Sequence, residues 1–417
     1  MSNALENQGD LFSNECMDIL KILNTYFEVR VVGGSVRDHL IEKYFSLKFP
    51  RRIDYDIVVK ADFLEIIKIL KAHNLSYFDD SAKYGVLKIH YKNVMYDIAA
   101  PRKDLECFGR AARVVSGSYI SWLEDSMRRD FSINAIYCDI ENVMYDYHSG
   151  IKDLKEQKIK FVGDAVSRIR EDYLRILRFF RFSGLFHAPK FDDSEVKVLG
   201  EHRSMLQNLS KERIRKEMMA LLKTPYCMQS LKVMKSCEIL EIISPVLNQF
   251  IEKSRGCVPY DSILNVACIL IQDGDCDTTT ILESVIQLSK EIMFTNREFL
   301  RLKTLMKLYE YIGRLDVVVD DEECGKRAVF LFGVQAYVDF IKICNVIMDR
   351  GFSPSIEKIE EYAKITLPIN GHDIRPLVRS NADIGKYKRK ATQIYIDSNF
   401  TATKEEIIMR LSLLNNK

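Results

Sequence analysis

Short apolar runs and amphipathic helical segments alternate along roughly the first third of the chain. Residues 28–32 and 53–59 have the length and β-branched content of strands, and each run precedes a segment with apolar residues at helical spacing. Two further runs, 84–91 and 94–99, are separated by Lys92 and Asn93, which predicts a β-hairpin. We therefore expect a small mixed sheet with helices on one face.

The pattern changes in the rest of the chain. Residues 101–121 are polar and irregular, which predicts a long loop, and beyond residue 155 the strand signals largely end. Residues 168–186 are strongly helical, and helical periods with short polar breaks follow to the C-terminus. The predicted fold class is α+β, with a small mixed-sheet head followed by an all-helical remainder.

Composition and charge narrow the class of protein. The chain has 417 residues, of which 47% are hydrophobic and 29% charged, as in a globular protein with more than one structural unit. A net charge of +2 requires that any nucleic-acid surface be local. Ten cysteines without paired spacing predict reduced thiols and no zinc site. With no signal-peptide pattern and no apolar membrane span, we expect a cytoplasmic enzyme without a membrane partner.

Two adjacent glycines, Gly33 and Gly34, end the first apolar run, and an amphipathic segment follows directly. This order predicts a strand, a tight turn and a helix. Glycines let the backbone approach a ligand closely, and a helix N-terminus presents unpaired N–H groups and a positive dipole end. We expect this turn to bind a phosphate group.

Asp54 and Asp56 alternate along the next run and share one face of a strand. Two neighbouring carboxylates repel each other unless a cation lies between them, most simply Mg²⁺. Two metal ions about 3.5–4 Å apart would activate a hydroxyl and hold a triphosphate. Alternatively, both acids lie on the surface of an edge strand. Asp97 on the neighbouring run is either a third ligand or a solvated acid at a strand end.

A second chemical signal covers residues 171–181. On a continuous helix, Asp172, Arg175 and Arg178 share one face, with Arg181 next along it. The alternative is a solvated face with salt bridges, but apolar residues nearly surround this stripe. An acid beside an arginine matches the amine-plus-acceptor edge of cytosine and adenine, which uracil and guanine lack. We expect selection of C and A, with the remaining arginines serving the triphosphate.

Arg128, Arg129 and Asp130 precede an apolar run that contains Asn134. Arginine is suited to bidentate contacts with phosphate, so we assign this cluster to the nucleotide site rather than to a basic surface loop.

In this combination and order, these motifs resemble those of the class II tRNA nucleotidyltransferases (CCA-adding enzymes) and of the bacterial poly(A) polymerases. The spacer at residues 39–53 is longer than in the usual family pattern. The matching segments are Gly33-Gly34-Ser35-Val36-Arg37-Asp38 with Asp54-Tyr55-Asp56, then residues 128–135, 146–154, 171–175 and 209–217.

The resemblance implies a seahorse-like arrangement of a catalytic head (1–154), a nucleotide-selecting neck (155–225), a body (226–330) and a tail (331–417). It implies transfer of C and A from CTP and ATP to the tRNA 3′ end by two-metal chemistry with Mg²⁺ at Asp54 and Asp56. A poly(A) polymerase, or an enzyme adding only CC or only the terminal A, is the alternative, and the oligomeric state stays open. The nucleotide contacts implied are Gly33, Gly34, Arg37, Arg129, Asp172, Arg175, Arg178 and Arg181.

Overall fold

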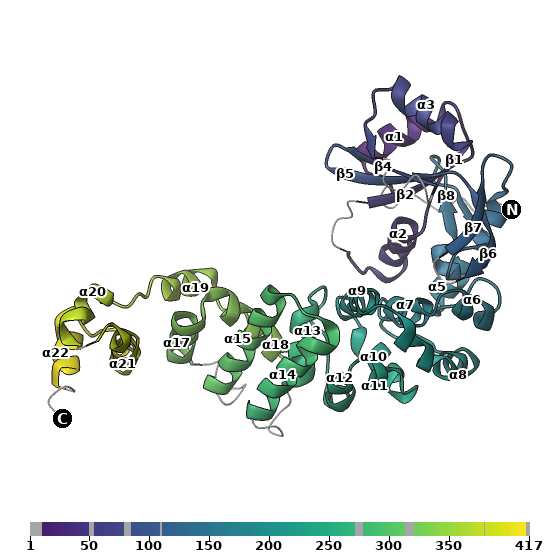
Figure 1. Ribbon diagram of the computed structural model, residues 1–417. Helices are drawn as coiled ribbons and strands as arrows, with labels where there is room; N and C mark the ends of the chain where they lie inside the picture. Colours follow the sequence, from purple (N-terminus) through teal and green to yellow (C-terminus); the bar gives the residue numbers. More distant parts are fainter. Residues whose placement is uncertain are drawn as a thin grey trace. The chain divides into compact units, whose positions relative to one another are not determined.

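The computed structural model in Figure 1 describes residues 11–49, 54–78, 85–108, 111–271, 278–312, 321–378 and 380–413. Its contacts divide the chain into two compact units, Met1–Leu221 with Gln229–Ile243, and Leu222–Met228 with Ser244–Lys417. A sheet lies in the N-terminal part and helices make up the remainder, which confirms the α+β prediction. The four-part division at residues 154, 225 and 330 stays a prediction.

A seven-stranded mixed sheet forms the head (Figure 1). Its order is β3-β4-β5-β2-β1-β8-β9, and the β2–β5 pair is parallel whereas the other pairs are antiparallel. The strands are β1 (Val29–Val32), β2 (Asp54–Val59), β3 (Tyr77–Phe78), β4 (Val86–Tyr91), β5 (Val94–Ala99), β8 (Ile136–Cys138) and β9 (Met144–Asp146).

Helices cover both faces of this sheet, so the expectation of helices on one face was wrong. Helices α1 (Asn14–Asn24) and α3 (Phe63–Ala72) lie on one side, and α2 (Gly34–Phe45) lies on the other (Figure 1). The reason is visible in β2, where both Ile57 and Val58 are buried although their side chains point to opposite faces. Each face therefore needs an apolar cover.

Two turn predictions had opposite outcomes. Lys92 and Asn93 join β4 to β5 with positive φ angles of 47° and 64°, as the predicted two-residue hairpin requires. The predicted long loop at 101–121 was wrong, because β6 (Arg102–Phe108) and β7 (Ala111–Ser116) form a second antiparallel sheet. The pairing shifts register between Asp104 and Glu106, which breaks the alternation on which strand recognition from sequence depends.

Helices complete the first unit. Helix α4 and the short turn η2 precede β8, and α5 follows β9. The remaining elements to the end of this unit, two of which run across its boundaries, are listed here with their bounds: α4 (Trp122–Met127), η2 (Ser132–Asn134), α5 (Gly150–Lys155), α6 (Ala165–Glu171), α7 (Leu174–Ser183), α8 (Asp193–Glu201), η3 (Arg203–Asn208), α9 (Lys211–Leu222), α10 (Cys227–Ser236) and α11 (Ile239–Ile243).

In the second unit every element with assigned regular structure, within the described ranges, is a helix. Near its C-terminal end, α20, α21 and α22 enclose a core that includes Ile374, Ala391 and Ile407. Nowhere in the described ranges is a helix long and apolar enough to cross a membrane. The elements are α12 (Pro245–Phe250), η4 (Ile251–Lys253), α13 (Ser262–Leu270), α14 (Thr278–Ile292), α15 (Asn296–Ile312), α17 (Glu322–Phe332), α18 (Val334–Met348), α19 (Ile356–Ala363), α20 (Gly371–Ile374), η5 (Arg375–Leu377), η6 (Asn381–Asp383), α21 (Ile384–Asp397) and α22 (Lys404–Leu413).

Candidate active site

The glycine turn between β1 and α2 has the predicted form. Gly33 has a φ of 82°, and a Cβ at this position would lie 3.2 Å from Oδ2 of Asp56 and 3.9 Å from Nη1 of Arg129. A side chain here would be strained and would fill the space beside the carboxylate. Next to the turn, the Oγ atom of Ser35 is buried without a hydrogen-bond partner among the described residues. The turn is therefore a narrow polar cradle.

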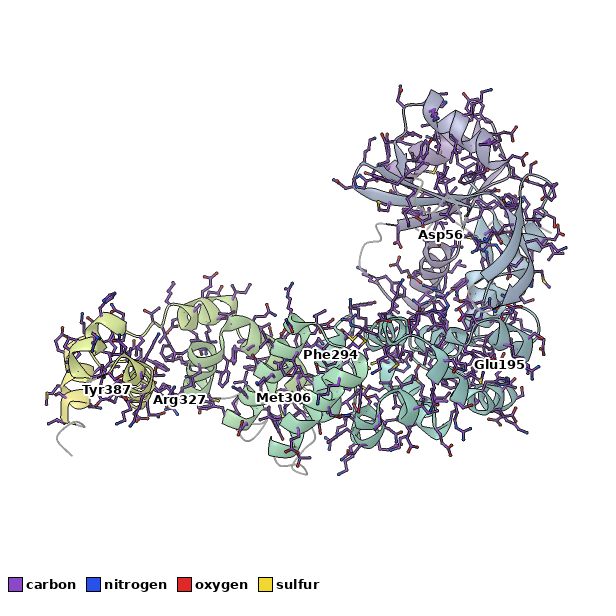
Figure 2. All side chains as sticks on the ribbon, in the orientation of Figure 1. Asp56, Glu195, Phe294, Met306, Arg327 and Tyr387 are labelled. Atoms are coloured by element: carbon purple, nitrogen blue, oxygen red, sulfur yellow. The ribbon has the colours of Figure 1, made fainter. Side chains whose placement is uncertain are left out.

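The two predicted carboxylates lie together on β2. Asp54 and Asp56 are exposed, and Asp56 pairs in register with Val32, the last residue of β1. Asp56, labelled in Figure 2, lies on the face of the sheet that carries α2 in Figure 1, and Asp54 shares this face because it stands two residues earlier on the strand. The intervening Tyr55 points to the other face, where it stacks on Tyr96 with ring centroids 5.9 Å apart. The strand thus presents two acids to solvent beside the glycine cradle.

Asp97 lies beside Asp56 in the parallel β2–β5 register. Its two carboxylate oxygens are 2.7 and 3.0 Å from Nζ of Lys88 on β4, so a lysine of the same sheet already neutralises it. Within the ranges described above, no group of three acidic, histidine or cysteine side chains converges as a metal site. The structure brings Asp97 next to the pair without completing a third ligand.

Arg37, on the first turn of α2, is a buried arginine of this site. Its Nη1 donates to Oδ1 of Asn134 at 2.6 Å and its Nε to Oδ1 of Asp38 at 2.7 Å. Burial lowers the pKa of the Arg37 guanidinium to about 10, while Asp130 and Asp56 favour its charged form. Arg37 is therefore a cation at neutral pH, fixed in position next to the carboxylate strand.

Arg129 is held from the opposite side. Its Nε donates to the Tyr137 hydroxyl at 3.0 Å, and its Nη2 donates to Oδ2 of the fully buried Asp125 at 3.2 Å. Burial raises the pKa of Asp125, but Arg128 and Arg129 outweigh that effect and bring it to about 2. This anchored pair leaves Nη1 of Arg129 facing the Gly33 turn.

Helix α5 explains the motif at residues 146–154. Gly150 touches the backbone of η2 so closely that a Cβ would lie 2.2 Å from the carbonyl oxygen of Ser132, a severe clash. Asp153 accepts a hydrogen bond from Oγ of Ser132 at 2.6 Å. Because η2 also carries Asn134, which contacts Arg37, this packing positions the second motif against the first.

The predicted continuous helix over residues 168–186 was wrong. Helix α6 ends at Glu171, Asp172 is extended with φ −155° and ψ 106°, and α7 begins at Leu174. Asp172 accepts a hydrogen bond from the backbone N–H of Leu174 at 3.1 Å. Aspartate competes in this way with helical backbone bonds and favours helix starts, so Asp172 lies in the break before α7 instead of on the face of a single helix.

Asp172 and Arg175 consequently have separate partners. Arg213 of α9 holds Asp172 with Nη2–carboxylate distances of 3.0 and 2.8 Å. Arg175 contacts Glu171 and donates through Nη1 to the carbonyl oxygen of Arg168 at 2.6 Å. The structure brings the two predicted base-reading residues to the same place but does not pair them with each other.

Arg178 and Arg181 follow on α7 and both face acids. Nε of Arg178 donates to Oδ2 of Asp130 at 2.7 Å. Glu217 of α9 lies 3.7 Å from Nη1 of Arg178 and 2.8 Å from Nε of Arg181. Burial lowers the pKa of Arg181 to about 10, although Glu217 favours its charged form. Helix α9 thus contacts both parts of the cluster. Its Arg213 binds Asp172, and its Glu217 binds Arg178 and Arg181.

These residues enclose a cavity of about 460 Å³ in which basic side chains outnumber acidic ones, an arrangement suited to a polyphosphate. It contains Arg129, Asp172, Arg175 and Arg178 of the predicted set. Sequence reasoning did not assign Ser35, Arg213 or Glu217 to the site, although the four-residue spacing of the last two was a readable signal. The lining residues are Arg128, Arg129, Asp130, Asp172, Leu174, Arg175, Arg178, Arg213, Lys216 and Glu217.

Comparisons with known proteins agree with this geometry. Residues 29–160 match the model of the poly A polymerase head domain, and residues 192–251 match that of the probable RNA and SrmB- binding site of polymerase A. The chain is 25% identical over 425 residues to the human CCA tRNA nucleotidyltransferase 1, mitochondrial, covering 97% of this chain and 92% of that protein. It is 28% identical to the CCA-adding enzyme of Staphylococcus haemolyticus, covering 88% of each.

Among solved structures, the CCA-adding enzyme of Bacillus stearothermophilus in complex with CTP has the same fold, with a TM-score of 0.75, 19% identity and coverage of 98% of both chains. A mixed sheet that sets a glycine turn beside two aspartates, followed by an arginine-rich helical cavity, defines a nucleotidyltransferase. The chain belongs to the family of class II CCA-adding enzymes and poly(A) polymerases.

Proposed function

We propose that this chain is a tRNA nucleotidyltransferase that adds C and A, from CTP and ATP, to the tRNA 3′ end without a nucleic-acid template. The observation that carries the proposal is the arrangement of the first unit, in which the Gly33 turn and the β2 aspartates accompany a cavity lined by Asp172 and Arg175. Relatives that match over most of their own length are named CCA tRNA nucleotidyltransferase or CCA-adding enzyme.

The glycine cradle holds the triphosphate. Gly33 and Gly34 admit it to the N-terminus of α2, a 12-residue helix whose first N–H groups and dipole favour an anion. The Oγ of Ser35, buried next to the turn without a hydrogen-bond partner among the described residues, is a proposed further donor to such a ligand. Arg37 and Arg129, fixed by their buried partners, contribute positive charge beside it.

The family implies a divalent metal ion, and we propose Mg²⁺ at Asp54 and Asp56. These two side chains fit such an ion because they are exposed hard oxygen donors on one strand face, beside a turn that a Cβ would fill. When bound there, the ion supplies charge neutralisation and lowers the pKa of the attacking hydroxyl. We propose Asp97 as a further carboxylate ligand of the metal ion. In the structure it forms an ion pair with Lys88, which metal binding would displace.

In the reaction, the tRNA 3′-oxygen forms a bond to the α-phosphorus while the bond from that phosphorus to the bridging oxygen of the β-phosphate breaks. Pyrophosphate leaves, and the proton of the 3′-hydroxyl passes to solvent or to a carboxylate of the β2 pair. No covalent enzyme intermediate is involved, so the protein contributes orientation and electrostatic stabilisation.

Base choice is assigned to the neck. Asp172 accepts from the exocyclic amine of C or A, and Arg175 donates to the adjacent ring acceptor, whereas U and G present the opposite pattern. Both residues have protein partners in the structure, so an incoming base replaces the contacts of Asp172 with Arg213 and of Arg175 with Glu171 or shares them. Arg178 and Arg181 contribute further charge toward the triphosphate.

The decisive experiment offers tRNA transcripts that end before the first C, after one C and after two C, with each nucleoside triphosphate in turn. Three additions followed by arrest are expected. A long A tract would instead establish a poly(A) polymerase, and arrest after CC or addition of the terminal A alone would establish a split activity. Omission and titration of Mg²⁺ against Mn²⁺ in the same assay tests the choice of metal.

The compartment is a separate proposal. The proposed location is the cytoplasm. Of the relatives, the vertebrate proteins are named as mitochondrial and others come from bacteria. Microscopy of the chain tagged at its C-terminus tests this proposal, and mitochondrial signal contradicts it.

A further inference from the structure

Two thiols lie in contact in the second unit. The Sγ atoms of Cys227 and Cys257 are 3.3 Å apart, although 30 positions separate them in the sequence. Cys227 begins α10 and is buried, while Cys257 precedes α13 and is partly exposed. A disulfide needs the sulfurs about 2.05 Å apart, so the two Sγ atoms must approach each other by roughly 1 Å for the bond to form.

A buried amide fixes the two segments that carry these cysteines. Nδ2 of Asn265 donates to the carbonyl oxygens of Leu222 at 2.7 Å and Val258 at 3.0 Å, and its Oδ1 accepts from the N–H of Val258 at 2.6 Å. Asn265 therefore ties the residue that follows Cys257 to the chain that leads into Cys227. The pair is held together by neighbouring residues before any covalent bond forms.

Two more contacts join the same segments. The backbone N–H of Tyr260 donates to the carbonyl oxygen of Lys223 at 3.1 Å, and Oγ of Ser254 lies 3.2 Å from Sδ of Met228. These contacts flank the cysteines on both sides. Thiols that native packing holds in contact react with each other much faster than thiols that must diffuse together.

The environment differs between the two sulfurs. The thiol of Cys227 and the backbone N–H groups of Met228 and Cys227, at the start of α10, donate to the sulfur of Cys257 and lower its pKa. The hydrogen bond to Cys257 and burial raise the pKa of Cys227. Helix N-termini favour thiolates, and the thiolate is the reactive form. The sulfur of Cys257 also belongs to the more exposed of the two residues, so an oxidant in solvent reaches it more easily than the buried Cys227.

We propose that Cys227 and Cys257 form a reversible disulfide site that responds to peroxide. The Cys257 thiolate attacks one peroxide oxygen and the O–O bond breaks, which gives a sulfenic acid and hydroxide that takes up a proton. The Cys227 sulfur then attacks the Cys257 sulfur, the S–O bond breaks, and water leaves with the Cys227 proton. Two thiols are oxidised, one peroxide is reduced to two waters, and a dithiol reverses the reaction.

The test exposes the full chain to a small excess of hydrogen peroxide, blocks remaining thiols, and maps the products by mass spectrometry. We expect a Cys227–Cys257 cross-linked peptide, two mass units lighter than its reduced parts, that disappears with dithiothreitol. Because the disulfide closes a long loop, the thermal midpoint of the oxidised protein should rise by a few degrees. Formation of other cross-links at the same rate would overturn the proposal.

Two variants keep the result interpretable. Cys257→Ser should lose both the cross-link and the oxidative rise in thermal midpoint while retaining nucleotide incorporation. Cys237→Ser is the matched control, because it removes a half-buried cysteine elsewhere and should leave the cross-link unchanged. If Cys257 is oxidised only to sulfinic acid in the wild-type chain, Cys227 is not its resolving thiol and the proposal fails. Nucleotide incorporation is measured separately, so this outcome is independent of the proposed function.

Discussion

The carboxylates of β2 and the charged residues of the neck differ in their exposure to solvent and in their ion pairs. Asp54 and Asp56 are exposed at the end of a strand, next to a turn without side chains. In the neck, Asp172, Arg178 and Glu217 have protein partners of opposite charge within 4 Å. The first group faces solvent beside the glycine turn, and the second forms ion pairs with neighbouring side chains.

This difference assigns a distinct role to each region. Exposed acids that share one face of a strand gain most from a bound cation, because the cation offsets the repulsion between the two carboxylates. A paired network instead fixes geometry in advance, and a ligand must share or displace its partners. We therefore expect the β2 carboxylates to determine the rate of nucleotide transfer and the neck residues to determine which nucleotide reacts.

The strongest way to break this comparison is at β2. Replacing Asp54 or Asp56 by Asn should lower nucleotide incorporation by about 10³-fold, because losing several kcal/mol of charge stabilisation costs a factor of ten for each ~1.4 kcal/mol. Binding of tRNA, measured by filter retention, should change little. Asp18→Asn on α1 is a matched control, since it removes an exposed carboxylate from the other side of the sheet.

Asp97 sharpens the same contrast. If this acid joins the β2 pair when the metal binds, Asp97→Asn should raise the Mg²⁺ concentration needed for half-maximal incorporation by about tenfold. Lys88→Met removes its present partner and should not raise that requirement. Equal effects of the two substitutions would mean that only the ion pair within the sheet matters.

In the neck, the largest effect should fall on base choice. Arg175→Ala should reduce discrimination against UTP and GTP by about 10–100-fold, since one bidentate base contact contributes about 1–3 kcal/mol. The measurement is kcat/KM for each nucleotide on one tRNA transcript. Arg203→Ala removes another arginine of the same unit, paired with Glu238, and should leave discrimination unchanged. Unaltered rejection of UTP by the Arg175 variant would contradict the assignment.

The comparison also explains how much the sequence could predict. The β2 site was predictable because its geometry is local, with a glycine turn, a strand of period two and a hairpin at Lys92-Asn93. For the neck, the sequence indicated which residues lie together but not the conformation of the chain that carries them. Asp172 separates α6 from α7, and this break depends on its hydrogen bond to Leu174 and its contact with Arg213, which no helical periodicity indicates.

Distance in the sequence limited the rest. Arg213 and Glu217 contact residues 30 or more positions earlier, and no periodicity in one segment identifies partners in another. Ser35 belongs to the motif at residues 33–38. Its role in the site is indicated only by the structure, in which its Oγ is buried without a hydrogen-bond partner among the described residues. The hairpin of β6 and β7 was missed because its register shift and polar residues hide the alternation.

Arg213 tests whether internal balance matters for selection. Arg213→Ala should lower kcat/KM for CTP and ATP about tenfold, because Asp172 loses the partner that fixes its carboxylate. Arg213→Lys should recover only part of the loss, since lysine lacks the planar donor geometry of arginine. The informative readout is discrimination against UTP, which a purely structural loss would leave unchanged.

Lys211→Ala supplies the control for this substitution. Lys211 is exposed at the start of the same helix, so the variant loses one positive charge without touching Asp172. Normal base choice in both variants would show that Arg213 holds α9 in place but does not position the base-reading acid.

Glu195 of α8 (Figure 2) is a third kind of carboxyl: it is half-buried, and among the described residues no ion pair joins it to a basic side chain. Burial, with a smaller effect from Asp192, raises its pKa to about 7, and Lys160 offsets only part of this. A carboxyl whose folded pKa exceeds its unfolded pKa stabilises the protein fully below the unfolded value, and this contribution is lost as pH rises through the folded value. The affected window is about pH 4.5 to 7.

Glu195→Gln removes that titration and keeps the shape of the side chain. The variant and the wild type should therefore approach each other in stability near pH 5, and the variant should be more stable at pH 8 by about 1–2 kcal/mol, allowing for the partial exposure of the site. Thermal unfolding at a series of pH values measures the difference, and Glu201→Gln on the exposed side of α8 should show none. A variant that is less stable than the wild type at pH 8 would mean that the ionised Glu195 is paired after all, as the neck acids are, and that burial without a balancing cation is not the state of this carboxyl.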